Sequence, residues 1–401
     1  EKTMKKRFAG LLAAAMLAAT LVGCGGGGAE ETTAANTAAE AGAEEGTGTS
    51  DGSGDSVEGK KLLFFAFQNI GDYGTNDLGY YAAQEIAEKY NIDMTLVEGG
   101  MDASTRTTTL LDAIETGGYD YVISSSWYIQ DDLLANVDRF PDMKFILYDT
   151  APTLDLSEYP NVFGVSFRQD EGSFLTAVYQ CLMSENHKIG AAANQDSPIL
   201  NDFVTGWLAG VKYYNDNMAE DGEEVEYNIA YYSDQTVQGA YETVNVLYNN
   251  GCDVVYNIGG SYCVGALNAC SEHGGIENNQ YLIGVDYDQY TTFANAETEV
   301  AGYENLVTSM EKRITQCCVL AFDGIVSGDM EMGNHRFGVA DGGTGLAYNE
   351  NYYAHTPEDV QNTITEIEQM ITDGDIVVPS YYDLPDYDTF AQFRDDPDYR
   401  L

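Results

Sequence analysis

Short apolar runs alternate with stretches of helical periodicity along most of this 401-residue chain, and this alternation constrains the fold more than any other feature. The first apolar run is Leu62–Phe67, and Asp77–Tyr90 follows it with apolar residues at helical spacing. The two signals recur in two series, over about residues 60–165 and 185–290. Strands that alternate with helices in this way build parallel sheets covered by helices. The sequence therefore predicts an α/β protein of two lobes, with a ligand cleft at the carboxyl ends of their strands.

The expected elements follow in chain order. Further strands are expected at 93–97, 119–123, 144–148, 188–193, 225–232, 253–258, 281–285 and 335–339. Further helices are expected at 104–116, 199–214, 237–249, 265–270, 306–325 and 357–371. One more helix, after the strand 119–123, is expected to end at residue 133. We expect residues 59–170 to form one lobe, 171–300 the second, and 301–401 to return between the two.

The N-terminal 58 residues carry a different signal. A basic cluster at residues 5–7 precedes an apolar stretch, 8–22, that is too short to span a membrane comfortably. The stretch ends in Leu21-Val22-Gly23-Cys24, which resembles the site at which bacterial lipoproteins are cleaved and lipidated. Residues 25–58 hold no aromatic residue and too little apolar surface to fold. We therefore expect a signal peptide over 1–23, a lipidated Cys24 with a linker to residue 58, and anchoring at the extracytoplasmic face of the cell membrane.

The composition narrows the classes of partner. The chain holds 65 acidic against 18 basic residues, a formal net charge of −47. Such a surface repels nucleic acid and anionic lipid headgroups, so neither is expected as a partner. Six cysteines beyond Cys24 fit no zinc spacing; some could pair in an exported protein, while Cys317 and Cys318 are expected to be buried thiols. The six are Cys181, Cys252, Cys263, Cys270, Cys317 and Cys318.

The sequence offers no catalytic constellation. It has no phosphate-binding glycine-rich loop with a lysine and no nucleophile elbow, and its four histidines lack metal-ligand spacing. We therefore expect a binding protein without metal or cofactor. Three loops at strand ends are candidate ligand contacts: 71–77, 259–261 and 286–288. Each is equally compatible with an ordinary turn or helix cap.

At this point the residues resemble the basic membrane protein family of substrate-binding lipoproteins from ABC transporters, whose members bind purine nucleosides. The resemblance runs over about residues 60–380. It is carried by the loop 71–77, by 165–167 with 170–175, by Phe203 with 206–211, by 253–260, by 283–289, and by Ser309 with Lys312.

The resemblance implies roles for individual residues. Asp286 and Lys312 would bind ribose hydroxyls, and Asn76 would also face the sugar. Without the resemblance, the sequence favours a solvated helix face as the place of Lys312. Two positions depart from the family on the base side: Thr75 replaces an aromatic residue, and Gln169 replaces an aspartate. The candidate ligand-binding residues are Asp72, Tyr73, Thr75, Asn76, Gln169, Gly260, Tyr262, Asp286 and Lys312, with Tyr73 and Tyr262 as possible stacking rings.

The predicted function is that of a monomeric solute-binding lipoprotein that passes a nucleoside-like ligand to an ABC permease and its ATPase. Two readings stay open beside it. The same fold could bind a sugar or a flavin-like solute, or report ligand status to a membrane partner. A nucleoside-hydrolysing enzyme is the third reading, without a catalytic constellation to support it.

Overall fold

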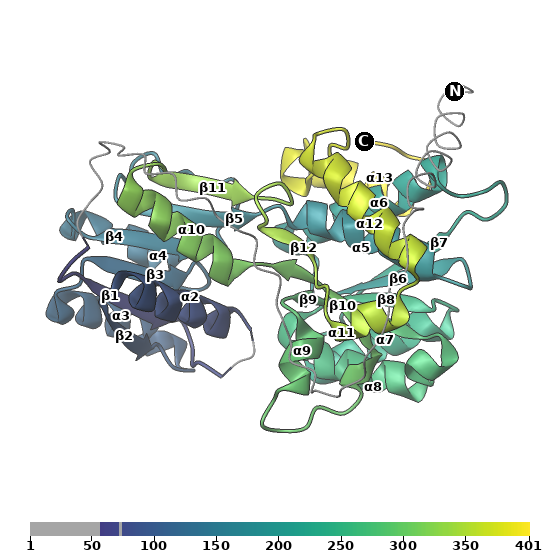
Figure 1. The fold of residues 1–401 in the computed structure, drawn as a ribbon, viewed down its shortest axis with the longest axis horizontal. Helices are drawn as coiled ribbons and strands as arrows, with labels where there is room; N and C mark the ends of the chain where they lie inside the picture. Colours follow the sequence, from purple (N-terminus) through teal and green to yellow (C-terminus); the bar gives the residue numbers. More distant parts are fainter. Residues whose placement is uncertain (1–56, 72–73) are drawn as a thin grey trace, which may run out of the picture. The chain divides into compact units, whose positions relative to one another are not determined.

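The computed structural model describes residues 57–71 and 74–401. The predicted signal peptide, Cys24 and nearly all of the predicted linker lie outside these residues, as do Asp72 and Tyr73. Two six-stranded sheets form the described chain, and we call each sheet with its covering helices a lobe (Figure 1). The predicted α/β architecture, with parallel strands flanked by helices, is confirmed.

The first lobe is built on the sheet β11-β5-β4-β3-β1-β2, in which all neighbours are parallel. Its strands are β1 (Lys61–Ala66), β2 (Asp93–Glu98), β3 (Tyr121–Ser125), β4 (Lys144–Tyr148), β5 (Val162–Phe167) and β11 (Gly333–Phe337). Its helices are α2 (Thr75–Tyr90), α3 (Ala103–Gly117), α4 (Gln130–Leu134) and α10 (Ile314–Ser327). β1 is buried on both faces: Leu62 and Phe64 pack with α2 and α10, and Leu63 and Phe65 pack with α3 and α4. This explains its continuous apolar run.

The second lobe is built on the sheet β12-β10-β9-β8-β6-β7, in which only β12 runs antiparallel to its neighbour. Its strands are β6 (Lys188–Ala193), β7 (Glu226–Tyr231), β8 (Val254–Ile258), β9 (Tyr281–Asp286), β10 (Leu306–Lys312) and β12 (Thr344–Leu346). Its helices are α5 (Gln169–Met183), α6 (Pro198–Asn217), α7 (Val237–Asn249), α8 (Cys263–Glu272), α9 (Gln289–Ala294), α11 (Glu350–His355), α12 (Glu358–Thr372) and α13 (Tyr387–Asp395). Short 3₁₀ turns lie at Val137–Arg139, Gly260–Tyr262, Gly275–Asn278, Tyr303–Asn305 and Tyr381–Asp383.

The predicted long helix at 306–325 is wrong. Its first part is strand β10, and helix α10 begins only at Ile314. Residues 306–310 are all buried, so β10 is covered on both faces and shows no alternation to distinguish it from a buried helix. Lys312 consequently ends a buried strand and does not lie on a solvated helix face. The alternation also gave no prediction of strands β5 and β12 or of helices α5, α9, α11 and α13.

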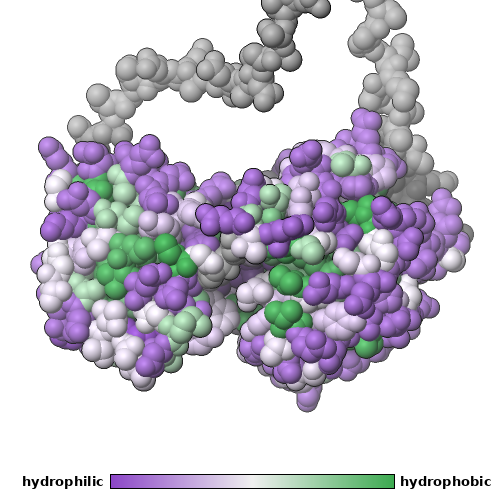
Figure 2. Space-filling model, turned by 90° about the horizontal axis from the view of Figure 1, so that it is seen from below, coloured by the Kyte–Doolittle hydropathy of each residue, from purple (hydrophilic) through white to green (hydrophobic). Residues whose placement is uncertain are grey.

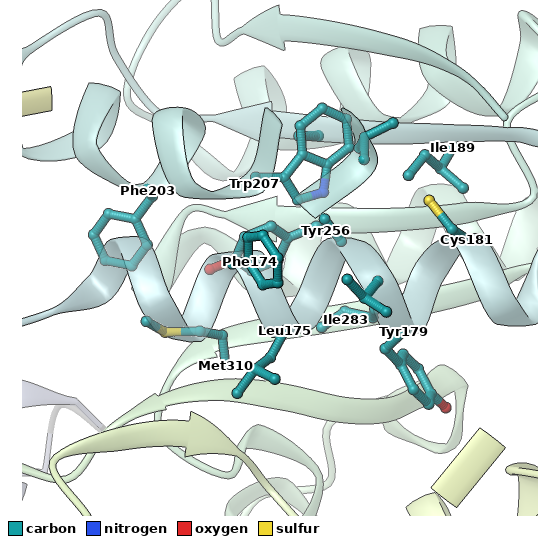
Figure 3. Packing of buried hydrophobic residues seen from close by; sticks show 14 of the residues in the cluster. Phe174, Leu175, Tyr179, Cys181, Ile189, Phe203, Trp207, Tyr256, Ile283 and Met310 are labelled. Atoms are coloured by element: carbon teal, nitrogen blue, oxygen red, sulfur yellow. The ribbon is translucent and has the colours of Figure 1, made fainter. Parts of the chain in front are cut away.

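The core of the second lobe gathers around α5, which packs against α6. Figure 3 shows Phe174 of α5 close to Trp207 of α6 and Tyr256 of β8, with Leu175 and Tyr179 on the other side of the same helix. Glycine allows the two helices to approach, because a Cβ at Gly206 would lie 2.0 Å from the carbonyl oxygen of Asp170. All six described cysteines are free and buried, which agrees with the prediction for Cys317 and Cys318.

The chain crosses between the lobes at three places. Arg168 connects β5 to α5, Arg313 connects β10 to α10, and residues 338–343 connect β11 to β12. Arg168 and Arg313 share one backbone conformation, with φ/ψ of −84°/62° and −81°/63°. Each also donates its amide at one end of the third crossing: Arg168 N to Phe337 O, directly before it (2.8 Å), and Arg313 N to Gly343 O, its last residue (2.9 Å). The crossings are therefore hydrogen-bonded to one another beside the cleft.

The surface agrees with the acidic composition. Figure 2 shows a face on which hydrophilic residues predominate and hydrophobic residues gather only in small patches. Across residues 57–71 and 74–401, no helix combines the length and apolar character needed to traverse a bilayer. The same residues contain no group of His, Cys, Asp or Glu side chains placed to hold a metal ion.

Candidate functional site

A cleft of about 550 Å³ lies where strands of both lobes end. The first lobe lines it with residues that follow β1, β3 and β4, together with the start of α2. The second lobe lines it with residues that follow β6 and β8, with the end of β9 and β10, and with the first turns of α6. The carboxyl ends of parallel strands are where α/β proteins bind ligands.

Lys312 lies at the centre of a cluster of charged side chains in the cleft. Its Nζ lies 3.0 Å from Asp149 Oδ1 and 3.1 Å from Asp286 Oδ1, so it joins a carboxylate of the first lobe to one of the second. Its side chain is only 4% exposed. Burial alone would lower the pKa of Lys312, but the two carboxylates outweigh burial and raise that pKa above its ordinary value. The cluster holds one lysine cation between two carboxyl groups at the wall of the cleft.

The two carboxylates occupy matching positions in the two lobes. Asp149 follows β4 and Asp286 ends β9, and these strands hold the same place in their sheets. Both residues adopt left-handed backbone conformations, with φ of 62° for Asp149 and 72° for Asp286. Few residues other than glycine tolerate this region, although Asp and Asn are among those that do. The backbone thus turns sharply at both strand ends and directs each carboxylate to Lys312.

The two carboxylates differ in whether an oxygen atom remains free to accept a hydrogen bond from a ligand. Asp149 is 5% exposed, and its Oδ2 also accepts a hydrogen bond from Trp127 Nε1 at 2.7 Å. The side chain of Asp286 is 20% exposed and uses Oδ1 for Lys312. Oδ2 of Asp286 lies beside Gly260, where an added Cβ would approach to 3.3 Å. Asp286 Oδ2 is therefore the acceptor that the cluster presents to a ligand.

Aromatic rings from both lobes line the same cleft. Trp127 and Tyr128 follow β3 in the first lobe, and Phe203 and Tyr262 come from α6 and the turn after β8. Phe203 is nearly buried, and its ring lies 5.5 Å from Lys312 Nζ. Amide side chains supply further polar groups, and Asn194 Oδ1 is a buried acceptor without a hydrogen-bond partner. Rings beside a few convergent polar groups are typical of a site for a small polar ligand with a flat part.

The structure separates the sequence-predicted residues into three groups. Thr75, Gly260, Tyr262, Asp286 and Lys312 all line the cleft. Asn76 and Gln169 are buried and do not line it. Asn76 instead accepts a hydrogen bond from Phe67 N (3.1 Å) at the end of β1. Asp72 and Tyr73 lie outside the described residues.

Several residues of the cleft were not predicted as ligand contacts, among them Trp127, Tyr128, Asp149, Asn194 and Phe203. Asp149 directly follows the predicted strand 144–148, as Asp286 follows 281–285, whereas Trp127 and Tyr128 lie four and five residues beyond the predicted strand 119–123. The rule applied to Asp286, that polar residues after a strand meet the ligand, would therefore have found Asp149.

A larger hollow, of about 950 Å³, lies along the edge strand β7 and residues 394–400. Its basic groups are already bound within the protein. Lys212 Nζ donates to three backbone carbonyls between Asp396 and Tyr399, and Arg400 pairs with Asp216 at 2.8 Å. Size alone therefore does not make this hollow a ligand site, and the interlobe cleft is the better candidate.

Comparison with known proteins agrees with this geometry. Residues 60–380 match the family described as "ABC transporter substrate-binding protein PnrA-like" (Bmp). Basic membrane protein D of Borreliella burgdorferi (strain JD1) is 25% identical over 339 residues, which are 83% of this chain and 91% of that protein. The CD4+ T-cell-stimulating antigen of Listeria monocytogenes serovar 1/2a is 24% identical over 275 residues, which are 68% and 73% of the two chains.

Solved structures share the fold. An ABC transporter solute-binding protein of Aeropyrum pernix K1 superposes with a TM-score of 0.65 at 24% identity, over 83% of this chain and 96% of that chain. A solute-binding protein of Conexibacter woesei DSM 14684 gives a TM-score of 0.63 at 17% identity, over 80% and 99%. At these identities the likeness establishes the two-lobed architecture of type I periplasmic binding proteins, and no more.

Proposed function

Because the chain belongs to the ABC transporter substrate-binding protein PnrA-like family, we propose that it captures a purine nucleoside, or a closely related ribosylated ring, for import. Substrate-binding proteins of ABC transporters act outside the cytoplasm, bind a small ligand and work with a permease and an ATPase. The finer assignment, a nucleoside as the ligand, rests on the chemistry of the cleft.

The observation that carries the proposal is the Lys312 cluster. A vicinal diol needs an acceptor for its hydroxyl hydrogens and a donor to its oxygens, placed side by side. Asp286 Oδ2 supplies the acceptor, and the ammonium group of Lys312 lies 3.1 Å from the other oxygen of the same carboxylate. Hydrogen bonds to charged groups are stronger than those between neutral groups. The ribose of a nucleoside presents such a diol, and the rings across the cleft suit its base.

The base side of the site differs from the sequence prediction. Gln169 is buried and is not among the residues that line the cleft, so we propose that other groups recognise the base. The groups available for base recognition are Trp127, Tyr128 and the unpartnered Asn194 Oδ1. They favour a flat ring that carries a hydrogen-bond donor.

We also propose that the protein is held at the outer face of the cell membrane by a lipid on Cys24. The basic cluster 5–7, the short apolar stretch 8–22 and the sequence ending in Cys24 support this. A single lipid chain binds membranes only marginally, so stable anchoring requires more than one chain. We expect a Cys24→Ser change to release the protein from the membrane. The released protein would then appear in the culture medium or the periplasm.

The ligand is tested by thermal shift and calorimetry with purine and pyrimidine nucleosides, free bases, riboflavin and ribose. A ligand that binds only the folded protein raises the melting temperature by mass action. We expect a purine nucleoside to give the largest shift, and Asp286→Asn to weaken its binding at least 10-fold. Asparagine keeps the left-handed backbone of Asp286 but removes the charge. Asp142→Asn, an exposed change in a turn outside the cleft, is the matched control.

Two results would overturn the assignment. If only ribose or another solute without an aromatic ring shifts the melting temperature, the ligand is not a nucleoside. If mass spectrometry finds free base after incubation with a nucleoside, the protein is an enzyme and not a pure binder.

A further inference from the structure

Tyr128 combines two unusual features at the mouth of the cleft. Its side chain is 68% exposed, although it lines a site otherwise walled by half-buried and buried rings. Its backbone is left-handed, with φ of 62°. For a bulky residue this conformation is a genuine outlier, and it persists only where the surroundings impose it. Strain of this kind is concentrated at sites that bind ligands.

A buried cation lies against the Tyr128 ring. The guanidinium carbon of Arg106, a residue that is 5% exposed, lies 5.2 Å from the ring centroid. Arg106 donates to Gly100 O at 3.3 Å, while its Nε has no hydrogen-bond partner. Among the described residues no carboxylate oxygen lies within 4.0 Å of it, and the carboxylate of Asp102 interacts with it from a greater distance. Since a desolvated cation over an aromatic face is attracted more strongly than an exposed one, the ring is a substantial partner for this arginine.

Two further rings fix the position of Tyr128. The centroids of Phe67 and Trp127 lie 5.6 and 6.2 Å from its own, both at tilted angles. Arg106, Phe67 and Trp127 therefore contact the ring, while about two thirds of the residue stays in contact with solvent. A ring that is held firmly but left open is pre-organised for stacking.

We propose that Tyr128 is the stacking wall for the flat ring of the ligand and that Arg106 is the residue that positions it. The proposal rests on the proposed function, and it narrows the ligand to solutes with a flat, conjugated ring. It also accounts for Thr75, which has no ring to offer at the position where the resemblance led us to expect an aromatic residue. Tyr128 supplies that ring from the loop after β3, and the ring-bearing Phe203 and Tyr262 lie on the opposite lobe.

The test measures binding of the best purine nucleoside and of ribose to the purified protein by calorimetry. Tyr128→Phe should bind both within about 2-fold of the wild type. Tyr128→Ala should bind the nucleoside roughly 10- to 100-fold more weakly, since loss of one stacked ring has an effect of this order, with ribose unchanged. Tyr128→Gly should lose the same affinity with a smaller fall in melting temperature than Tyr128→Ala, because glycine adopts the left-handed backbone freely. That variant separates lost stacking from lost folding.

Two further variants complete the design. Arg106→Met should weaken nucleoside binding several-fold and leave ribose binding unchanged, as expected for a residue that acts through Tyr128. Tyr353→Ala removes an equally exposed tyrosine (57%) outside the cleft and should change neither. Trp127 gives an optical readout, because the chain has two tryptophans and the other, Trp207, is fully buried. Nucleoside binding should therefore change the emission of Trp127, and ribose binding should not.

The outcomes separate the two proposals. Wild-type nucleoside affinity in Tyr128→Ala would overturn the stacking wall and leave the proposed function standing. If the protein binds riboflavin instead of nucleosides and Tyr128→Ala weakens this binding, the stacking role of Tyr128 is supported and the nucleoside assignment is overturned. Binding only of solutes without an aromatic ring, such as ribose, would overturn both.

Discussion

Replacing Lys312 with methionine tests the charge cluster on which the proposed site depends. Methionine fills the space of the aliphatic stem and removes only the cation. The side chains of Lys312 and Asp149 are 4% and 3% exposed, so the variant leaves a buried carboxylate with the indole N–H of Trp127 as its remaining donor. Breaking a buried ion pair by removing one partner costs about 3–5 kcal/mol. We expect a loss of that order in the free energy of unfolding.

The loss translates into a measurable shift. Unfolding entropy is about 2.1 cal/mol/K per residue, or roughly 0.7 kcal/mol/K for a chain of about 340 described residues, so 3–5 kcal/mol corresponds to a fall of about 4–7 °C in melting temperature. Differential scanning calorimetry of the ligand-free protein measures it. Lys89→Met is the matched control: Lys89 pairs with Asp323 at 2.7 Å, but the two side chains are 48% and 30% exposed, so the expected loss is about 0–1 kcal/mol.

A double variant checks the cause. Adding Asp149→Asn to Lys312→Met removes the uncompensated charge, so it should recover a substantial part of the lost stability. If Lys312→Met melts within about 1 °C of the wild type, the cluster is not desolvated in solution and the reasoning is refuted.

Three further predictions concern the rest of the molecule. Burial is the main cause that raises the pKa of Asp202 to about 7, and the neighbouring Asp170 raises it further. Arg336, Ser380 and the amide of Tyr381 lower this pKa, but they offset only part of the rise. The folded state then holds a proton that the unfolded state releases between about pH 4 and 7, so stability should fall as pH rises through that window. Asp202→Asn should flatten the fall in urea midpoint between pH 5 and 8, and parallel curves for the two proteins would contradict the assignment. Gly206→Ala should cost several kcal/mol by circular dichroism melting, since its Cβ would meet the Asp170 carbonyl at 2.0 Å; an unchanged melting temperature would mean that the α5–α6 contact is looser than described. The six buried cysteines should resist a thiol reagent in the native protein and react with it in urea. Fast reaction of any of them in the native protein would show that this cysteine is exposed to solvent by local opening.

The sequence alone determined the α/β class and most of the elements. Strand β1 and helix α2 were predicted because hydrophobic periodicity is a local property that neighbouring residues carry. Asp286, Gly260 and Tyr262 were found for a related reason: a residue directly after a predicted strand lies at the carboxyl edge of a parallel sheet, wherever that strand is placed. The lipid-anchor signal at residues 5–24 is likewise local, and remains a prediction.

Only the tertiary structure decided which residues meet. Lys312 was known as a candidate, but its partner Asp149 is 163 residues away in the chain and belongs to the other lobe. Asn76 was expected to face the ligand and instead supports the end of β1, because the direction of a side chain at a helix start depends on how the strand and helix pack. The strand β10 was mistaken for a helix, since burial on both faces removes the alternation that identifies a strand. The cleft is assembled from residues that are distant in sequence, and the strand order that brings them together is set by packing across the whole chain, which no local pattern records.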